Sequence, residues 1–242
     1  FAFILWLCVT TIFAISVDNS FDQMVKVIRI QIVTVLTIMV IKSRKELDVL
    51  LWVIVLSIGF YGIKGGLFTI QTLGGSRVWG PPGGFIEENN SLAVALLMVL
   101  PLMYYLKGQI ERRWVELCLL FAMGLIVISV FGSQSRGALI AIGATSVFLW
   151  LKLPNKMLPA LIIVLFAIGI FAFMPDSWHG RMDTISNYQA DDSAMGRINA
   201  WKMAINLANH RFFGGGFNIW TTQVYQMYAL EWDIPRAAHS IY

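Results

Sequence analysis

The sequence has few charged residues and almost no cysteine. Only 13% of the 242 residues are charged, whereas 57% are hydrophobic, and the mean hydropathy is +0.70. A soluble core does not need apolar runs as long and uninterrupted as those found here, so an ordinary soluble domain is excluded. Cys8 and Cys118 both lie inside apolar segments, which favours packing roles over a disulfide or a metal site.

Three further patterns are missing. The apolar runs do not alternate with polar residues and are too long for strands, which argues against a membrane barrel. No basic stripe is interleaved with aromatic residues, so the net charge of +4 does not indicate nucleic-acid binding. The segment that follows Phe1 lacks a basic n-region and a cleavage site, so we expect a membrane span of a chain truncated at both ends, not a signal peptide.

Long apolar segments are what the chain has in abundance. Because about 17–25 helical residues cross a bilayer, the sequence predicts an all-α polytopic membrane protein with about seven transmembrane helices. The predicted spans are 1–17, 24–41, 47–63, 91–106, 114–131, 137–151 and 157–174. We therefore expect residues 1–174 to form a transmembrane bundle and the more polar residues 175–242 to lie at the membrane surface.

Lys and Arg are distributed unevenly among the loops between these spans. The basic loops carry Lys42, Arg44 and Lys45, then Lys107, Arg112 and Arg113, then Lys152 and Lys156. The alternate loops, predicted at 18–23, 64–88 and 131–135, carry only Lys64 and Arg77. The positive-inside rule then places the basic loops in the cytoplasm, and Arg136 and everything after Met174 on the outer face.

A short polar turn joins two of the predicted spans and ends in an arginine. The turn and the start of the next span read Ser133-Gln134-Ser135-Arg136-Gly137-Ala138-Leu139. A permanently charged guanidinium at the end of a span is expensive and by default marks a functional site. The alternative is an interface anchor whose charged head reaches toward water.

The segment after Met174 is predicted to contain two helices. Residues 193–209 have the pattern of an amphipathic helix, with Arg197 beside its apolar stripe. That stripe consists of Ile198, Trp201, Ile205 and Ala208. Gly214-Gly215-Gly216 ends the helical region, and Asn218 is predicted to cap a second helix that carries Trp220, Tyr225 and Tyr228.

Five short motifs occur in the order seen in O-antigen ligase and polymerase-like proteins, and the chain resembles this family. They are Asn90-Ser91-Leu92-Ala93, Ser135-Arg136-Gly137-Ala138-Leu139, Gly196-Arg197-Ile198-Asn199-Ala200-Trp201, Gly214-Gly215-Gly216-Phe217 and Ala238-His239-Ser240-Ile241-Tyr242. The stretch from Gly84 to Asn90 resembles in particular the O-glycosylation ligases that accompany exosortase systems. Arg211 and Ser240 depart from the family pattern, which often has Pro and Asn there.

The resemblance implies glycan transfer from an undecaprenyl-diphosphate carrier to an acceptor hydroxyl, at the periplasmic face of a bacterial cytoplasmic membrane. Arg136 and Arg197 would bind the diphosphate, and His239 would be the general base. Asn90 is either a glycan contact or a helix cap. The implied partners are the lipid-linked donor, an acceptor protein, lipid or polysaccharide, and membrane lipids. No metal and no cofactor is expected.

Three alternatives remain open at this point. A polysaccharide polymerase of the same superfamily would share the donor chemistry. A metal-dependent glycosyltransferase could use Asp18 and Asp22, or Asp191 and Asp192, as ligands, although neither pair has supporting His or Glu neighbours. A transporter or flippase would need ionisable residues at mid-membrane depth, whereas the centres of the predicted spans are nearly free of charge.

Overall fold

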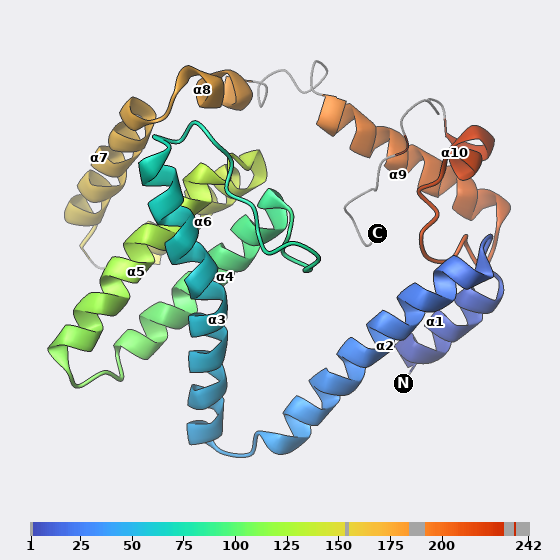
Figure 1. Cartoon of the computed structure of the whole chain (residues 1–242), viewed down its shortest axis with the longest axis horizontal. Coiled ribbons are helices and arrows are strands. Elements are labelled where there is room, and N and C mark those ends of the chain that lie inside the picture. Colours follow the sequence, from blue (N-terminus) through green and yellow to red (C-terminus); the bar gives the residue numbers. More distant parts are fainter. Residues whose placement is uncertain (1, 153–154, 184–191, 230–234, 236–242) are drawn as a thin grey trace. The chain divides into compact units, whose positions relative to one another are not determined.

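The protein is helical throughout the part of the chain that the structure describes. The computed structural model describes residues 2–152, 155–183, 192–229 and 235, which contain helices and no strand (Figure 1). The helices are α1 (Ala2–Ile12), α2 (Val17–Val40), α3 (Arg44–Gln71), α4 (Asn89–Lys107), α5 (Arg113–Gly132), α6 (Arg136–Lys152), α7 (Met157–Phe173), α8 (Asp176–Asp183), α9 (Asp192–His210) and α10 (Thr222–Tyr228). The predicted all-α class is confirmed.

All seven predicted spans fold as helices, although their lengths differ. Helices α2, α3, α4 and α5 are long and apolar enough to cross a membrane. Helix α1 has 11 residues, and α6 and α7 have 17 residues each. At 1.5 Å per residue, 17 residues cover about 25 Å of a hydrocarbon core that is about 30 Å thick. The protein is thus a multi-pass membrane protein, and its described residues include four full-length candidate spans besides the shorter apolar helices.

Two of the predicted loops are partly or wholly helical. Helix α2 begins at Val17, so residues 18–23 belong to its first turns. Helix α3 continues to Gln71, beyond the predicted end at residue 63, and includes Gly65 and Gly66. The glycine pair is typical of a loop, but here both residues are buried in a helix–helix contact. Tertiary packing therefore outweighs the local preference of glycine for irregular structure.

The chain divides into two compact units, each with its own core. The first unit consists of Phe1–Lys42 and Ser186–Tyr242, and the second consists of Ser43–Ile185. The second unit therefore contains α3 to α8, and the first contains α1, α2, α9 and α10. The expected division at residue 174 refers to the membrane boundary and stays a prediction.

Close helix packing organises the second unit. Helices α3, α4 and α5 contact one another around a core that includes Val55, Leu92, Leu96 and Ile126. On α3, the buried residues at the contact include Gly62, Gly65 and Gly66. A Cβ atom at Gly66 would collide with the backbone carbonyl of Leu125 on α5. Glycine is required there because the two backbones approach too closely for any side chain.

In the first unit, helix α9 packs on α10 and has a second apolar face. Ala200, Met203 and Leu207 of α9 are buried against Val224 and Tyr225 of α10. The sequence analysis did not predict this packing face, because the predicted apolar stripe consists of other residues of the same helix. Of the predicted stripe, Trp201, Ile205 and Ala208 are exposed and Ile198 is partly buried; Trp201 and Ile205 have exposed fractions of 46% and 61%.

The start of α10 corrects one prediction. Its N-cap is Thr221, whose side chain accepts a hydrogen bond from Val224 N (3.4 Å). Asn218 is not the cap: its φ is +56°, and its side-chain amide donates to Asn19 O (3.1 Å). Asn tolerates the left-handed conformation, so the same residue type that favours a cap also favours this turn.

The contact between α3 and α5 predicts unequal effects of two glycine substitutions. We expect Gly66→Ala to lower the stability of the protein by about 1–3 kcal/mol, because the added methyl forces the two helices apart. In the matched control Gly124→Ala on α5, the new Cβ meets no atom within 4 Å. That change should leave stability unchanged or raise it by up to about 1 kcal/mol through helix propensity. Thermal unfolding of both purified variants in detergent measures the difference, and equal midpoints would contradict this packing.

Candidate functional site

The turn between α5 and α6 is polar and buried. Ser133, Gln134 and Ser135 have exposed fractions of 0%, 6% and 6%. Ser133 Oγ donates to Val130 O (2.6 Å) and accepts from Ser135 N (3.2 Å). Ser135 Oγ in turn accepts from Ala138 N (3.2 Å), as the side chain of a helix N-cap does. The serine residues of the sequence motif therefore form hydrogen bonds with buried backbone groups and determine where α6 begins.

Arg136 is the first residue of α6 and is partly buried. The N-terminus of a helix carries unpaired N–H groups and a partial positive charge. Adding a guanidinium at this position strengthens the local positive potential. An anion is the ligand that such an arrangement suits, and phosphate groups commonly bind at helix N-termini.

The loop between α3 and α4 is bonded directly to the turn that carries Arg136. Val78 N donates to Gly132 O (3.0 Å), and the side-chain amide of Gln134 donates to Gly74 O (3.1 Å). Asn89, the first residue of α4, donates from Nδ2 to Ser133 O (2.8 Å). These bonds hold the start of α4 and the start of α6 together. Asn90 therefore directly follows Asn89, whose side chain is hydrogen-bonded to the turn.

Asn90 is not a helix cap. The residue that precedes α4 is Glu88, and Asn90 is the second residue of the helix, partly buried. Its neighbour Asn89 makes the inter-segment bond, which the sequence pattern did not single out. The pair of adjacent Asn residues at the start of the span could have indicated such a bond. Only the register of the helix, however, decides which of the two faces the turn. A role for Asn90 as a glycan contact stays a prediction.

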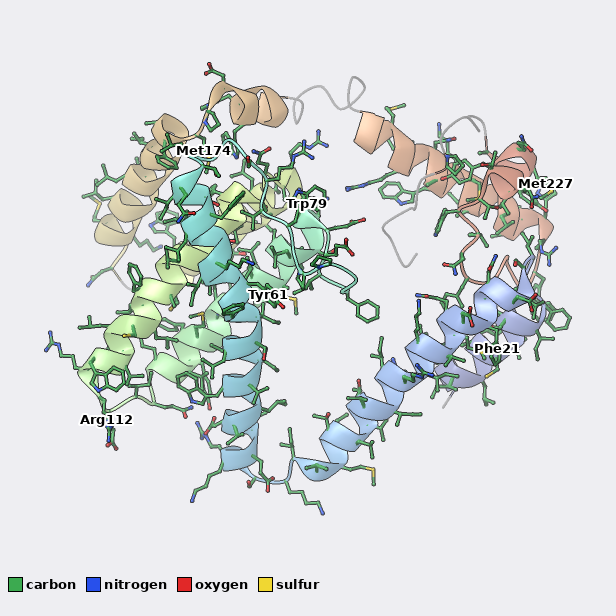
Figure 2. The ribbon with its side chains drawn as sticks, viewed as in Figure 1. Phe21, Tyr61, Trp79, Arg112, Met174 and Met227 are labelled. Carbon is green, nitrogen blue, oxygen red and sulfur yellow. The ribbon has the colours of Figure 1, made fainter. Side chains whose placement is uncertain are left out.

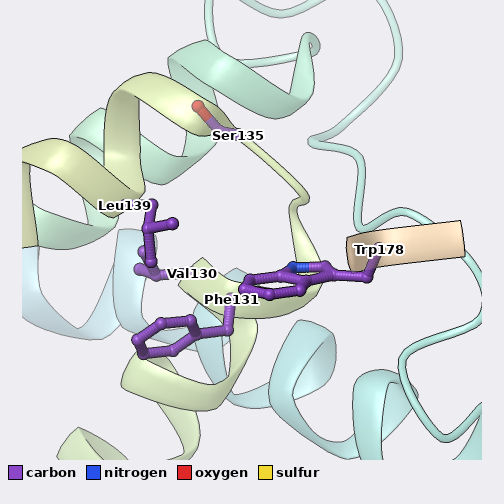
Figure 3. Close-up of a pocket in the computed structure, with 5 residues that line it drawn as sticks. All are labelled: Val130, Phe131, Ser135, Leu139 and Trp178. Atoms are coloured by element: carbon purple, nitrogen blue, oxygen red, sulfur yellow. The ribbon is translucent and has the colours of Figure 1, made fainter. Parts of the chain in front are cut away.

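Helix α8 covers one side of the same turn. Trp178 is 1% exposed and lines a small recess together with Val130, Phe131, Ser135 and Leu139 (Figure 3). The recess has no room for even a water-sized molecule, whereas ordinary ligand sites enclose roughly 300–1,000 Å³. It is therefore a packing contact that supports the turn, and no substrate site. Sequence reasoning missed this role of Trp178.

Arg197 lies in the first unit, near the start of α9. It is partly buried, and it forms no hydrogen bond or ion pair with other described residues. Its position is one turn before Trp201, as predicted. The guanidinium is therefore not committed to a structural contact within the described part of the chain.

The glycine loop after α9 docks on the turn between α1 and α2, within the same unit. Gly215 O accepts from Ile15 N (3.0 Å), and Phe217 O accepts from Ser20 Oγ (3.0 Å). Gly216 has a φ of +80°, and a Cβ there would collide with Ala14. The family-like glycine motif thus serves a close backbone approach to the N-terminal hairpin.

Arg211, which departs from the family pattern, has a structural role in this loop. Its Nε donates to Gly214 O (3.1 Å), and its Nη2 donates to Phe13 O (2.8 Å). Because these bonds tie the loop to itself and to the α1–α2 turn, the guanidinium replaces the stiffness that a proline would give. Arg211 is therefore no candidate for the donor site.

The three histidines differ in their surroundings. His179 Nδ1 lies 3.1 Å from Pro175 O, and His210 Nδ1 lies 2.8 Å from Asn206 O, one helical turn back in each case. Both rings are thus occupied locally, as expected for residues without a matching motif. His239, the predicted base, lies outside the described residues.

The structure therefore brings together part of the predicted set. Asn90 and Arg136 lie in the second unit, where bonds between the α3–α4 loop and the α5–α6 turn connect their segments. Arg197 lies in the first unit. Of the alternative metal ligands, Asp18 and Asp22 lie one turn apart and exposed on α2.

Comparison with known protein families shows which family the chain belongs to. A sequence profile described as O-antigen ligase matches residues 121–242, half of the chain. The chain belongs to the O-antigen ligase family. A second profile, of a family of unknown function, matches residues 1–111. No curated protein and no solved structure matches the chain.

Family membership fixes the general activity. Proteins of the O-antigen ligase and polymerase group act on a lipid-linked glycan and an acceptor in the membrane, so this family member is a membrane glycosyltransferase of that group. The matched range contains Arg136, Arg197 and His239, whereas Asn90 lies in the other matched range. The closer resemblance to exosortase-associated ligases stays a prediction.

Proposed function

We propose that this O-antigen ligase family member transfers a glycan from an undecaprenyl-diphosphate carrier to an acceptor hydroxyl at the outer face of the cytoplasmic membrane. The observation that carries this proposal is the position of Arg136, at the N-terminus of α6 and directly after a buried turn whose serine hydroxyls are hydrogen-bonded. A rigid support of this kind keeps a charged group in place during a reaction, as electrostatic catalysis requires.

The chemistry follows from the leaving group. As the bond between the sugar anomeric carbon and the diphosphate oxygen breaks, negative charge grows on the lipid diphosphate. Guanidinium groups bind phosphate oxygens through two parallel N–H bonds, so Arg136 and Arg197 are suited to stabilise that charge without a metal. The leaving lipid diphosphate takes the bonding electron pair and stays bound to the arginines until it is released.

The acceptor must lose a proton as it attacks. A new bond forms between the acceptor oxygen and the anomeric carbon, and the hydroxyl proton passes to a base. Histidine suits this role because its ordinary pKa lies near neutrality, and we assign it to His239. Asn90, near the same turn, is suited to hold a sugar hydroxyl by its side-chain amide.

A polymerase of the same superfamily is the second candidate, because it would use the same donor and the same charged residues. The two differ only in the acceptor, which is a growing glycan for a polymerase and a protein or lipid for a ligase. The resemblance of the stretch from Gly84 to Asn90 to O-glycosylation ligases favours ligation to a protein. Glycan analysis of a deletion strain separates them, since the acceptor that loses sugar identifies the reaction.

The orientation of the bundle predicts a labelling pattern. In a background with Cys8→Ala and Cys118→Ala, we expect a cysteine at Ser76 to react with a membrane-impermeant thiol reagent in intact cells. Cysteines at Glu111 and Asn155, in the basic loops, should react only after permeabilisation. All three native side chains are exposed, so accessibility within the protein is matched. Since bonds connect the loop of Ser76 to the turn of Arg136, the opposite pattern would move the proposed site to the cytoplasmic face.

The diphosphate-binding role predicts a strong effect of conservative substitutions. Lysine keeps the charge of arginine but loses the planar fork, so Arg136→Lys and Arg197→Lys should each slow transfer on the order of 10²-fold. Transfer from purified lipid-linked donor is the measurement. Arg112→Lys, at an exposed site in a basic loop, is the control and should keep wild-type activity. Wild-type rates in both site variants would refute the assignment.

The base and the binding groups are separable by a third set of variants. His239→Ala should lower transfer by about 10²–10⁴-fold while donor binding persists, because the arginines still hold the diphosphate. His179→Ala and His210→Ala should be close to neutral. Activity should rise with pH as the base loses its proton, and it should survive a chelator. Chelator-sensitive transfer that a divalent ion restores, together with an active His239→Ala variant, would favour the metal-dependent alternative.

A further inference from the structure

Arg77 lies in the loop between α3 and α4 and is held at the turn that carries Arg136. Its side chain is exposed, and its Nε donates to Gln134 Oε1 (3.3 Å). Within the described residues, no carboxylate forms an ion pair with it. The sequence alone placed Arg77 only on the outer loop, and nothing in the family motifs includes it.

Gln134 is an unusual residue with which to hold an exposed arginine. It is 6% exposed and has a φ of +53°, a conformation that costs a non-glycine residue about 1 kcal/mol or more. Its Nε2 donates to Gly74 O while its Oε1 accepts from Arg77, and these two partners fix the orientation of the amide. A strained residue that persists because its surroundings hold it is a feature of functional sites.

Within the part of the chain that the structure describes, the remaining donors of Arg77 have no partner and can bind a ligand. With Nε engaged, the two terminal nitrogens still carry four N–H groups in the planar fork that matches phosphate oxygens. Only Ser135 separates Gln134 from Arg136 in the sequence. An anion bound at this turn is attracted by the positive charges of both arginines.

We propose that Arg77 is a further cation of the donor site, which binds phosphate oxygens of the lipid-linked donor, and that Gln134 positions it. This inference rests on the proposed function. The same oxyanion chemistry is present in the headgroups of bulk anionic lipids. The anchoring of Arg77 to the turn of Arg136 favours the donor, because a headgroup anchor needs no strained residue to hold it.

The test uses the full-length protein in vesicles of zwitterionic lipid, with glycan-free undecaprenyl diphosphate as the probe. Arg77→Gln should weaken binding of the probe and raise the KM for the donor about tenfold, with a smaller change in kcat. Arg77→Lys should recover part of the loss. Arg112→Gln removes the same charge at the α4–α5 connection, away from the loop of Trp79 (Figure 2), and should bind as wild type.

A double-mutant cycle tests the positioning role. Asparagine tolerates the left-handed conformation but is too short to reach Arg77, so Gln134→Asn should raise the donor KM by a similar factor. In the Arg77→Gln background the same change should add little, whereas a merely structural role would give additive losses.

The outcomes separate this inference from the proposed function. If the wild-type protein does not bind the probe, the proposed function and the role of Arg77 are both overturned. If Arg136→Lys weakens binding but Arg77→Gln binds as wild type, only the role of Arg77 is overturned. If the effect of Arg77→Gln appears solely when the vesicles contain anionic lipid, Arg77 binds headgroups, and the inference is also overturned.

Discussion

Satisfying buried polar groups at the α5–α6 turn is the constraint on which the rest of the second unit depends. A turn at the end of two apolar helices exposes carbonyls and amides that have no water to bind, and each one left unpaired costs several kcal/mol in an apolar medium. Here partners come from Gly74 and Val78 of the α3–α4 loop and from Asn89 at the start of α4. Because that loop must reach the turn, α3 has to end and α4 has to begin where they do. The same hydrogen bonds therefore support the turn before Arg136 and determine the course of the α3–α4 loop.

The same constraint explains why α3 and α5 approach so closely. Gly62, Gly65 and Gly66 bring the backbone of α3 against α5, and the last turns of both helices then lie beside each other. Gly132 and Thr69 are in contact at this point, since a Cβ on Gly132 would collide with the Thr69 side chain. A looser contact would separate Gly74 from Gln134 and break the bond between loop and turn. Helix packing thus sets the geometry of the turn and the loop at this end of α3 and α5.

Much of this fold is predictable from the sequence because its signals are local. Apolar segments of membrane length gave the helices, and the pattern from residue 193 to 209 matches α9 within one residue at each end. The failures are all tertiary. Gly65 and Gly66 were predicted to lie in a loop, because only the contact with α5 explains glycines inside a helix. Asn218 was predicted to be the N-cap of α10, but the cap is Thr221. Only the register of α4 shows that Asn89, and not Asn90, bonds the turn. Of the site, Arg136 and Arg197 carry motifs, whereas Gln134 and Arg77 are linked by a contact across 57 positions that no local pattern records.

The docking of the glycine loop has a consequence for how such proteins can exchange parts. The profile that defines the family begins at residue 121, yet its glycine motif is bonded to Ile15 and Ser20, and the preceding Arg211 is bonded to Phe13. These three partners belong to the region matched by a separate family. A C-terminal half transplanted onto a different N-terminal half would meet a foreign surface at Gly216, where even a methyl group has no room. The two halves are therefore constrained to diverge together, and a recombination junction near the middle of the chain separates residues that must match.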